Sequence, residues 1–339
     1  MKKIRFGVVG TNFITDWVIA GAREDYRFEL TAVCSRTRER GEEFAAKHNI
    51  PHIFTSLEQM AASDLIDAIY IASPNYAHAE QSILCMNSGK HVLCEKPMAA
   101  NAKQARQMVE CAHKNGVALM EAMKSTLSPN FLAVKENINR IGTPRRYFAS
   151  FCQYSSRYDK FKEGVILNAF RPELANGAMM DIGVYTIYPL VTLFGKPKTI
   201  NAQGVVLSSG VDGQGAVNMQ YEGFNATVLY SKIANSQLPA EIEGEDGNIM
   251  IDRIQTPVDV RLYPRQAPAS GHEKRTEGEI LSQSECHNEY YYEVKEFIDL
   301  IEQGRIESNV NSHQNSITTL EIIDEVRHQL GVHYPSDDE

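Results

Sequence analysis

The segment 89–97 is the part of this sequence that most restricts how the chain can fold. Its centre, residues 92–94, is the apolar run Val-Leu-Cys, which predicts a short β-strand buried on both faces. Glu95, Lys96 and Pro97 follow directly, so two opposite charges stand at the strand's carboxyl end, where open α/β sheets bind their ligands. The proline confines Lys96 to extended geometry and permits a cis peptide bond. An exposed ion pair beside a turn is the alternative, so the interpretation depends on the rest of the chain.

Length and composition indicate a soluble globular protein. The chain has 339 residues, of which 43% are hydrophobic and 23% charged, and this is typical of a soluble protein with two domains. The formal net charge of −9 and the isoelectric point near 5.6 argue against a nucleic acid or an anionic membrane as a partner. No apolar run approaches the length that spans a bilayer.

The six cysteines are scattered along the chain, with no CxxC pair and no close spacing of metal ligands. This pattern is typical of single thiols in a reducing cytoplasm, and it predicts neither disulfides nor a metal site. The cysteines are Cys34, Cys85, Cys94, Cys111, Cys152 and Cys286.

The chain begins with a predicted strand, a glycine turn and a helix. Residues 4–10 form an apolar strand that ends at Gly10, and apolar residues at helical spacing follow Asn12. This order is typical of the first unit of a dinucleotide-binding fold, whose helix N-terminus binds a pyrophosphate. Asn12 and Thr15 replace the second and third glycines of the GxGxxG pattern, and we expect Asn12 to accommodate the turn by a positive φ. The candidate phosphate-binding residues are Gly10, Thr11, Asn12, Phe13 and Ile14.

The turn after the second predicted strand, residues 30–34, bears on the choice of cofactor. An acidic residue here would bind the ribose 2′-hydroxyl of NAD, whereas an arginine would bind the 2′-phosphate of NADP. The turn holds Arg36 between Ser35 and Thr37 and has no acidic residue, so it favours NADP and leaves NAD possible. Ser35 and Thr37 can add hydroxyl donors, and Thr37 can cap the helix predicted over 38–48. A solvated arginine at a helix start is the alternative.

A polar loop follows the predicted strand over residues 67–72. We expect this loop, Ser73 and Pro74 included, to lie along the nicotinamide ribose, with Asn75 and His78 as polar contacts. For His78, packing or helix capping explains the residue at least as well.

Four motifs occur in a characteristic order: residues 7–10, 72–74, 89–97 and 120–122. Together they resemble the Gfo/Idh/MocA oxidoreductase family, which includes glucose–fructose oxidoreductases and inositol dehydrogenases. The resemblance implies an N-terminal Rossmann domain, over residues 1–122, that binds NADP or NAD. Glu95, Lys96 and Glu121 stand within these motifs and are therefore counted among the cofactor-binding residues.

The remaining residues, 123–339, predict a C-terminal α+β domain, which makes the whole chain an α/β protein. Alternating segments between 198 and 263, separated by turn residues, indicate a large, mostly antiparallel sheet with one face open. Because members of the family use this open face for oligomerisation, the resemblance implies a homodimer or a homotetramer.

Asp181 and Tyr185 begin a predicted helix and share one of its faces, because they are four residues apart. A tyrosine near a lysine can be made more acidic, which suits proton exchange with a substrate hydroxyl; packing in the core is the alternative. The family commonly has Asp-x-Gly-x-His here. Tyr185 in place of the histidine resembles the branch of dihydrodiol and D-xylose dehydrogenases and glucose–fructose oxidoreductases, rather than the inositol branch.

We therefore expect a cytoplasmic oxidoreductase that moves a hydride between NADP and a carbon of a sugar, polyol or diol. Lys96 would hold the reacting oxygen, Tyr185 would exchange its proton, and Asp181 would orient the neighbouring hydroxyls. Two alternatives remain. One is an enzyme with tightly bound NADP that oxidises one sugar and reduces another, and the other is a non-catalytic NADP-binding sensor or regulator.

Overall fold

The chain divides into two compact units in the computed structural model, which describes residues 3–265, 277–283 and 287–338. Unit 1 contains Met1–Lys124 and His287–Leu320, and unit 2 contains Ser125–Cys286 and Glu321–Glu339. Five of the six cysteines are free thiols in the structure, and Cys286 lies outside the described residues.

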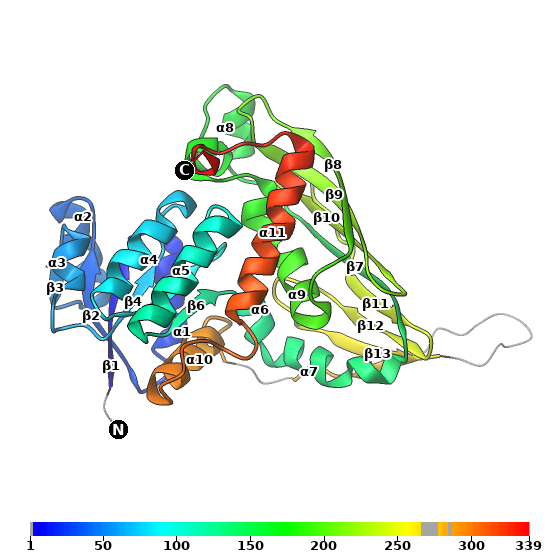
Figure 1. The fold of residues 1–339 in the computed structure, drawn as a ribbon, viewed down its shortest axis with the longest axis horizontal. Helices are drawn as coiled ribbons and strands as arrows, with labels where there is room; N and C mark the ends of the chain where they lie inside the picture. Colours follow the sequence, from blue (N-terminus) through cyan, green and yellow to red (C-terminus); the bar gives the residue numbers. More distant parts are fainter. Residues whose placement is uncertain (1–2, 266–276, 284–286, 339) are drawn as a thin grey trace, which may run out of the picture. The chain divides into compact units, whose positions relative to one another are not determined.

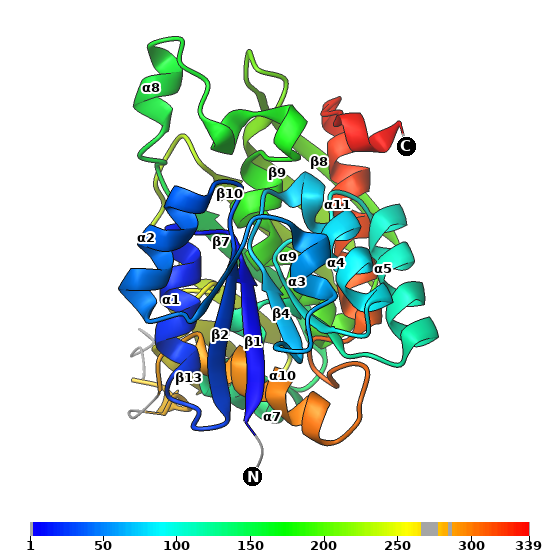
Figure 2. The same ribbon diagram turned by 90° about the vertical axis from the view of Figure 1, so that its left-hand side faces the viewer.

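Unit 1 alternates strands and helices, as the sequence predicted. The strands form a six-stranded parallel sheet in the order β3-β2-β1-β4-β5-β6. Figure 2 shows α1 and α2 on one side of this sheet and α4 and α5 on the other, which is why the central strands are buried. The elements are β1 (Ile4–Val9), α1 (Phe13–Ala22), β2 (Phe28–Cys34), α2 (Arg38–His48), β3 (His52–Phe54), α3 (Leu57–Ala61), β4 (Ala68–Ile71), η1 (Asn75–Ala77), α4 (His78–Asn87), β5 (His91–Glu95), α5 (Ala102–Asn115), β6 (Leu119–Ala122) and α10 (Tyr291–Glu302).

A segment from near the C-terminal end of the chain completes unit 1. The amide of Leu119, on the edge strand β6, donates to the carbonyl of Ile306 at 3.0 Å, and this contact covers an edge that would otherwise be open. Helix α10 packs against α1, where a Cβ on Gly21 would lie 2.8 Å from backbone and Cβ atoms of Tyr290. Unit 1 thus differs from the predicted first domain, residues 1–122, because the return of residues 287–320 depends on distant contacts.

Unit 2 is built on an eight-stranded sheet in the order β14-β13-β12-β11-β7-β10-β9-β8. Among the strand pairs of the described residues in this sheet, only that of β7 with β10 is parallel, so the prediction of a mostly antiparallel sheet is confirmed. The elements are α7 (Pro129–Asn137), η2 (Ile138–Ile141), β7 (Pro144–Cys152), α8 (Tyr158–Lys162), η3 (Asn168–Phe170), η4 (Pro172–Leu174), η5 (Met179–Gly183), α9 (Val184–Phe194), β8 (Thr199–Val206), β9 (Asp212–Gln220), β10 (Asn225–Ser231), β11 (Ala240–Gly244), β12 (Gly247–Ile251), β13 (Val260–Pro264), β14 (Glu279–Ile280) and η6 (Pro335–Asp337). The helices α6 (Lys124–Leu127) and α11 (His313–Leu330) cross the division between the units.

Helix α9 covers one face of the unit 2 sheet, against β7 and β10 (Figure 1). The buried hydroxyl of Tyr147, on β7, donates to the carbonyl of Thr186 at 3.1 Å and fixes the helix on the sheet. The longer segment Pro172–Phe194 has the length and composition of a membrane-spanning helix, which the sequence analysis did not single out, and 72% of its most apolar window is buried within the structure. Such burial is typical of a core helix in a folded unit.

We predict that Gly21→Ala makes the protein less stable by about 1–3 kcal/mol, because the new methyl group meets backbone atoms that cannot move freely. The gain of helix propensity, about 1 kcal/mol, offsets only part of this loss. Thermal unfolding measures the effect. Ala20→Leu, at the adjacent exposed position, serves as the control, and an unchanged melting temperature for Gly21→Ala would contradict the close packing of α1 on α10.

Candidate active site

The turn between β1 and α1 depends on a glycine and on a helix cap. Gly10 has a φ of +102°, and a Cβ there would lie 2.6 Å from the carbonyl oxygen of Ala72, so only glycine fits. Asn12 has a φ of −95° and caps α1: its side-chain oxygen accepts hydrogen bonds from the amides of Ile14 and Thr15. The expected positive φ at Asn12 is therefore wrong, because this residue stands at the N-cap and not in the turn.

The capping geometry limits which backbone groups of this turn can meet a ligand. The amide of Ile14 donates to Asn12 Oδ1 at 3.0 Å, and the hydroxyl of Thr15 donates to the carbonyl of Gly10 at 3.1 Å. The side-chain amide of Asn12 donates to the carbonyl of Ala72 at 3.1 Å, which ties the turn to the end of β4. Of the predicted phosphate-binding residues, Ile14 gives its amide to the cap, and Gly10 donates its amide to the carbonyl of Cys34 at 3.3 Å.

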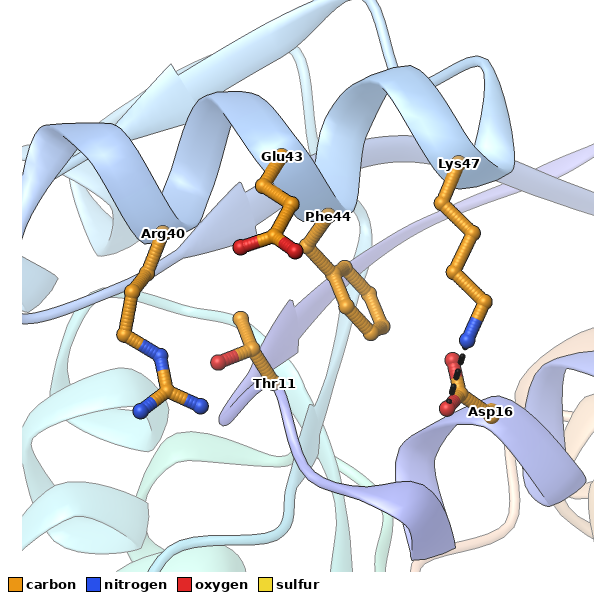
Figure 3. Close-up of a pocket in the computed structure, with 6 residues that line it drawn as sticks. All are labelled: Thr11, Asp16, Arg40, Glu43, Phe44 and Lys47. Atoms are coloured by element: carbon orange, nitrogen blue, oxygen red, sulfur yellow. Dashed lines mark ion pairs between the residues drawn. The ribbon is translucent and has the colours of Figure 1, made fainter.

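A cavity of about 250 Å³ lies between this turn and α2. Figure 3 shows the guanidinium of Arg40 and the hydroxyl of Thr11 facing the same space, while Lys47 pairs with Asp16 farther along the cavity. The lining residues are Thr11, Asp16, Arg40, Glu43, Phe44 and Lys47. The sequence analysis missed Arg40. A cation in the first turn of a helix, where the dipole disfavours positive charge, is the signal that could have found it.

The three candidate residues of the turn after β2 differ in their exposure to solvent. Ser35 is buried, and the hydroxyl of Thr37 caps α2 by accepting from the amide of Arg40 at 3.4 Å. Arg36 is exposed. Within the described part of the chain, no carboxylate pairs with the guanidinium of Arg36 or of Arg40, whereas Arg38 pairs with Glu42 at 3.0 Å. Two guanidinium groups are thus available for an anion near the first turn of α2.

The loop after β4 is held from inside by His78. This residue has no exposed surface, and its ring nitrogens lie 2.9 Å from the carbonyl oxygens of Ser73 and Pro97. Burial lowers the pKa of His78, and the neutral ring can donate to one of these carbonyls. The geometry therefore supports the packing alternative for His78. The exposed Pro74 and the half-buried Asn75 remain candidates for ligand contact.

Glu95 fixes the end of β5. Its carboxyl group is buried, where it accepts from the hydroxyl of Tyr70 at 2.5 Å and from the amide of Lys96 at 3.2 Å. Burial raises the pKa of Glu95 and also that of Tyr70. The alternative of an exposed Glu95–Lys96 ion pair is therefore wrong. Lys96 is half-buried and precedes a cis peptide bond to Pro97, which the sequence had allowed.

Glu121, at the end of β6, supports the segment that follows Lys96. Its side chain is 1% exposed, and Oε1 accepts from the amide of Met98 at 2.9 Å. Burial raises the pKa of Glu121 to about 7, while a hydrogen bond with Ser316 and the charge of Lys96 act in the opposite direction. Glu121 therefore holds the backbone after Lys96 in place from inside the protein, through its hydrogen bond with the amide of Met98.

Asp181 and Tyr185 lie where a π-helical turn, η5, passes into α9. Both are partly exposed, while the three residues between them are buried, so they share one accessible face as predicted. The ring of Tyr185 contacts Phe151 edge-on, with centroids 5.8 Å apart. Asp181 forms an ion pair with Lys232, a residue that the sequence analysis did not single out. π-turns inside helices are frequent at functional sites.

The candidate residues are divided between the two units. Unit 1 brings together the β1–α1 turn, the turn after β2, the loop after β4 and Lys96, and unit 2 holds Asp181 and Tyr185. The described residues contain no cluster of three or more His, Cys, Asp or Glu side chains that could hold a metal ion.

Comparison with known families matches most of the chain. A family described as "Oxidoreductase family, NAD-binding Rossmann fold" (GFO_IDH_MocA) matches residues 4–123, and the "GFO/IDH/MocA C-terminal domain" matches residues 131–250. Among solved structures, an aldose-aldose oxidoreductase from Caulobacter crescentus superposes with a TM-score of 0.83 and 19% identity, covering 97% of both chains. At that identity the likeness shows the fold alone.

Two relatives match along nearly the whole chain. The scyllo-inositol 2-dehydrogenase (NADP(+)) IolU of Bacillus subtilis is 52% identical over 334 residues, which are 98% of this chain and 99% of the relative. The trans-1,2-dihydrobenzene-1,2-diol dehydrogenase of Mus musculus is 30% identical, covering 98% of this chain and 99% of the relative. The inositol dehydrogenase is the more similar of the two.

We predict that Asn12→Ala lowers the stability of the protein by about 1 kcal/mol, since two amides at the start of α1 lose their acceptor. Asn12→Ser keeps a side-chain oxygen that can accept from these amides but loses the donor to the carbonyl of Ala72, so it should unfold between Asn12→Ala and the wild type. Thermal unfolding of the two variants compares them directly. Equal melting temperatures for Asn12→Ala and the wild type would show that this side chain is no cap.

Proposed function

This chain belongs to the Gfo/Idh/MocA oxidoreductase family, and we propose that it is an NADP-dependent dehydrogenase that oxidises a secondary alcohol of a cyclic polyol or a sugar. The observation that carries the proposal is the half-buried Lys96 at the carboxyl end of β5, fixed there by the buried Glu95. The 52% identity to an NADP-dependent scyllo-inositol dehydrogenase supports the cofactor and the substrate class.

The residues of unit 1 fit a dinucleotide phosphate. Gly10 leaves the space that a Cβ would fill beside Ala72, and the N-terminus of α1 lies directly after this turn, where a pyrophosphate is favoured. Arg36 and Arg40 supply two positive charges, without a carboxylate partner among the described residues, for the 2′-phosphate. We therefore assign the cavity beside Thr11 and Arg40 to the adenosine end of NADP.

In the proposed reaction, one residue stabilises negative charge and another transfers a proton. The bound cofactor supplies the nicotinamide carbon that accepts the hydride. The ammonium of Lys96 holds the substrate oxygen and stabilises negative charge on it as the hydride leaves its carbon. Tyr185 takes the hydroxyl proton, and Asp181 accepts hydrogen bonds from neighbouring hydroxyls of the polyol.

The same proposal covers the assembly and the location of the protein. One face of the unit 2 sheet carries α9, and Figure 1 draws no helix of the described residues on the other. We assign this open face to the contact of a homodimer or homotetramer, and the protein to the cytoplasm. A sugar–sugar oxidoreductase would keep its NADP through purification and dialysis, whereas a simple dehydrogenase would release it.

We predict that Arg36→Ala and Arg40→Ala each narrow the preference for NADP over NAD by about ten- to a hundredfold. Each variant loses a charged hydrogen bond to the 2′-phosphate, which is worth about 1.5–3 kcal/mol. Binding constants of both cofactors measure the preference. Arg38→Ala is the matched control, because Arg38 pairs with Glu42 on the same turn. Equal binding of NADP and NAD by the wild type would rule out a 2′-phosphate site here.

We predict that Lys96→Met lowers kcat with NADP and scyllo-inositol by about 10³-fold, the scale of one strong electrostatic group in a transition state. The fold and NADP binding should change little. Tyr185→Phe should also lose most activity, and the double variant should lose much less than the product of the single losses, because the two residues act on one proton and one charge.

Steady-state kinetics at the NADPH absorbance band decides between this enzyme and a non-catalytic regulator. Lys114→Met is the matched control, since Lys114 is an exposed lysine of the same unit. A Lys96→Met enzyme within tenfold of the wild type would end the proposed mechanism. A folded wild type that binds NADP but oxidises no inositol, sugar or diol would instead support the regulator.

A further inference from the structure

A second lysine, Lys232, lies in the interior of unit 2 and pairs with Asp181. It follows directly after β10, 51 residues away in sequence, and is 4% exposed. Its ammonium group forms a hydrogen-bonded ion pair with Asp181 Oδ2 and lies 5.7 Å from the ring centroid of Phe170. A fixed positive charge therefore stands behind the carboxylate that the proposed function assigns to the substrate.

The backbone holds Lys232 firmly in this place. Its amide donates to the carbonyl of Gly213 at 2.8 Å, and its carbonyl accepts from the amide of Ser155 at 2.8 Å. The amide of Gln153 donates to the carbonyl of Ser231, also at 2.8 Å. The bonds from Gln153 and Ser155 continue the parallel pairing of β7 and β10 beyond the strand ends, and the bond to Gly213, on β9, continues the antiparallel pairing of β9 and β10. The lysine therefore starts from a rigid position.

Burial makes the two partners of this ion pair unequal. The side chain of Lys232 is 5% exposed and that of Asp181 is 36% exposed. A buried ammonium group is costly without a partner, whereas a carboxylate that reaches solvent can stay ionised more easily. Lys232 thus depends on Asp181 as a partner for its buried ammonium group, and in return the ammonium group fixes one carboxylate oxygen of Asp181.

We propose that Lys232 is a positioning residue for the substrate: it keeps Asp181 ionised and aimed, so that Asp181 can accept hydrogen bonds from polyol hydroxyls. This inference rests on the proposed function, since it takes Asp181 as a group that contacts the substrate. Lys232 acts through Asp181 and not on the reacting atoms. The arrangement favours substrates with free hydroxyl donors over deoxy analogues, because only a donor can satisfy a carboxylate that has left bulk water.

The other titratable groups around this helix start are deeper in the unit. Asp212, on β9, accepts from the amides of Ala178 and Met179 at 3.1 and 2.7 Å, and burial raises its pKa. Burial also raises the pKa values of Tyr230, on β10, and of Tyr334. All of these groups remain in the Lys232 variants, and so does Tyr185, the titratable group that shares the accessible face with Asp181.

The test is the pH profile of kcat/KM with NADP and scyllo-inositol for the full chain. Lys232→Met removes the charge that faces the Asp181 carboxylate, so we expect activity that needs the ionised carboxylate to fall off at higher pH as the pH falls. We expect Lys232→Met to move the acid limb upward by about one unit or more. At pH 7 we expect kcat/KM to fall by about ten- to a hundredfold, mainly because KM rises. A change of this size corresponds to the loss of one charged hydrogen bond.

Two further variants make the result specific. Lys232→Arg keeps the charge and should keep the acid limb of the wild type, even where its activity is lower. Lys196→Met removes an exposed lysine that pairs with Glu321 at 2.6 Å in the same unit, and it should change neither the limb nor kcat/KM. If Lys232→Met does not fold, Lys232→Arg carries the test, and a limb moved upward in that variant overturns the proposal.

The outcomes also separate this inference from the proposed function. If Lys96→Met and Tyr185→Phe lose activity while Lys232→Met keeps the rate and the acid limb of the wild type, the positioning role fails and the dehydrogenase stands. If Lys96→Met stays within tenfold of the wild type, the proposed function itself fails. A deoxy-inositol oxidised as well as scyllo-inositol would also overturn the role of the pair of Asp181 and Lys232.

Discussion

The carboxyl group of Glu95 lies inside unit 1 with the hydroxyl of Tyr70 2.5 Å away, and the geometry around Lys96 depends on this contact. A buried carboxyl group is costly unless it is hydrogen-bonded, so Tyr70 both permits Glu95 and fixes its direction. The residues that follow are held in the same way: His78 lies 2.9 Å from the carbonyl of Pro97, and Glu121 accepts from the amide of Met98. Lys96 is the half-buried member of a segment whose neighbours point inward.

Much of the backbone around the candidate site is therefore held in place by buried side chains that cannot contact a ligand. His78 and Glu121 stand in or beside motifs of a cofactor-binding family, yet their side chains are fully or almost fully buried. Their contacts with backbone carbonyls and amides shape the loops at the carboxyl ends of β4, β5 and β6. A residue in a functional motif can thus act by holding the backbone, and burial distinguishes this role from direct contact.

Unit 2 uses the same principle with opposite charge. Asp181 is partly exposed, and the buried Lys232 stands behind it, much as Glu95 stands beside the accessible Lys96. In both places a buried ionisable side chain lies next to a more exposed side chain of opposite charge. The π-turn places Asp181 and Tyr185 on one accessible face, so a rigid carboxylate and a phenol are presented together. This division suits a reaction in which charge moves and the protein must not relax around it.

The sequence by itself determined the local elements and the family. Apolar runs such as 92–94 predicted buried strands, helical periodicity predicted α2 over Arg38–His48, and four motifs indicated a Rossmann domain. These signals are local, because burial on one or both faces imposes a fixed period on neighbouring residues. The choice of Lys96, Asp181 and Tyr185 also came from local patterns, although their joint action remains a proposal.

Only the tertiary structure decided which distant residues meet. It showed that Asn12 caps α1, that Arg40 faces the β1–α1 turn, and that residues 287–320 complete unit 1. It also brought Lys232 to Asp181 across 51 residues. A cavity wall and a buried ion pair each depend on which strands become neighbours in a sheet. Strand order is set by the packing of the whole unit, and no short window of sequence contains that information.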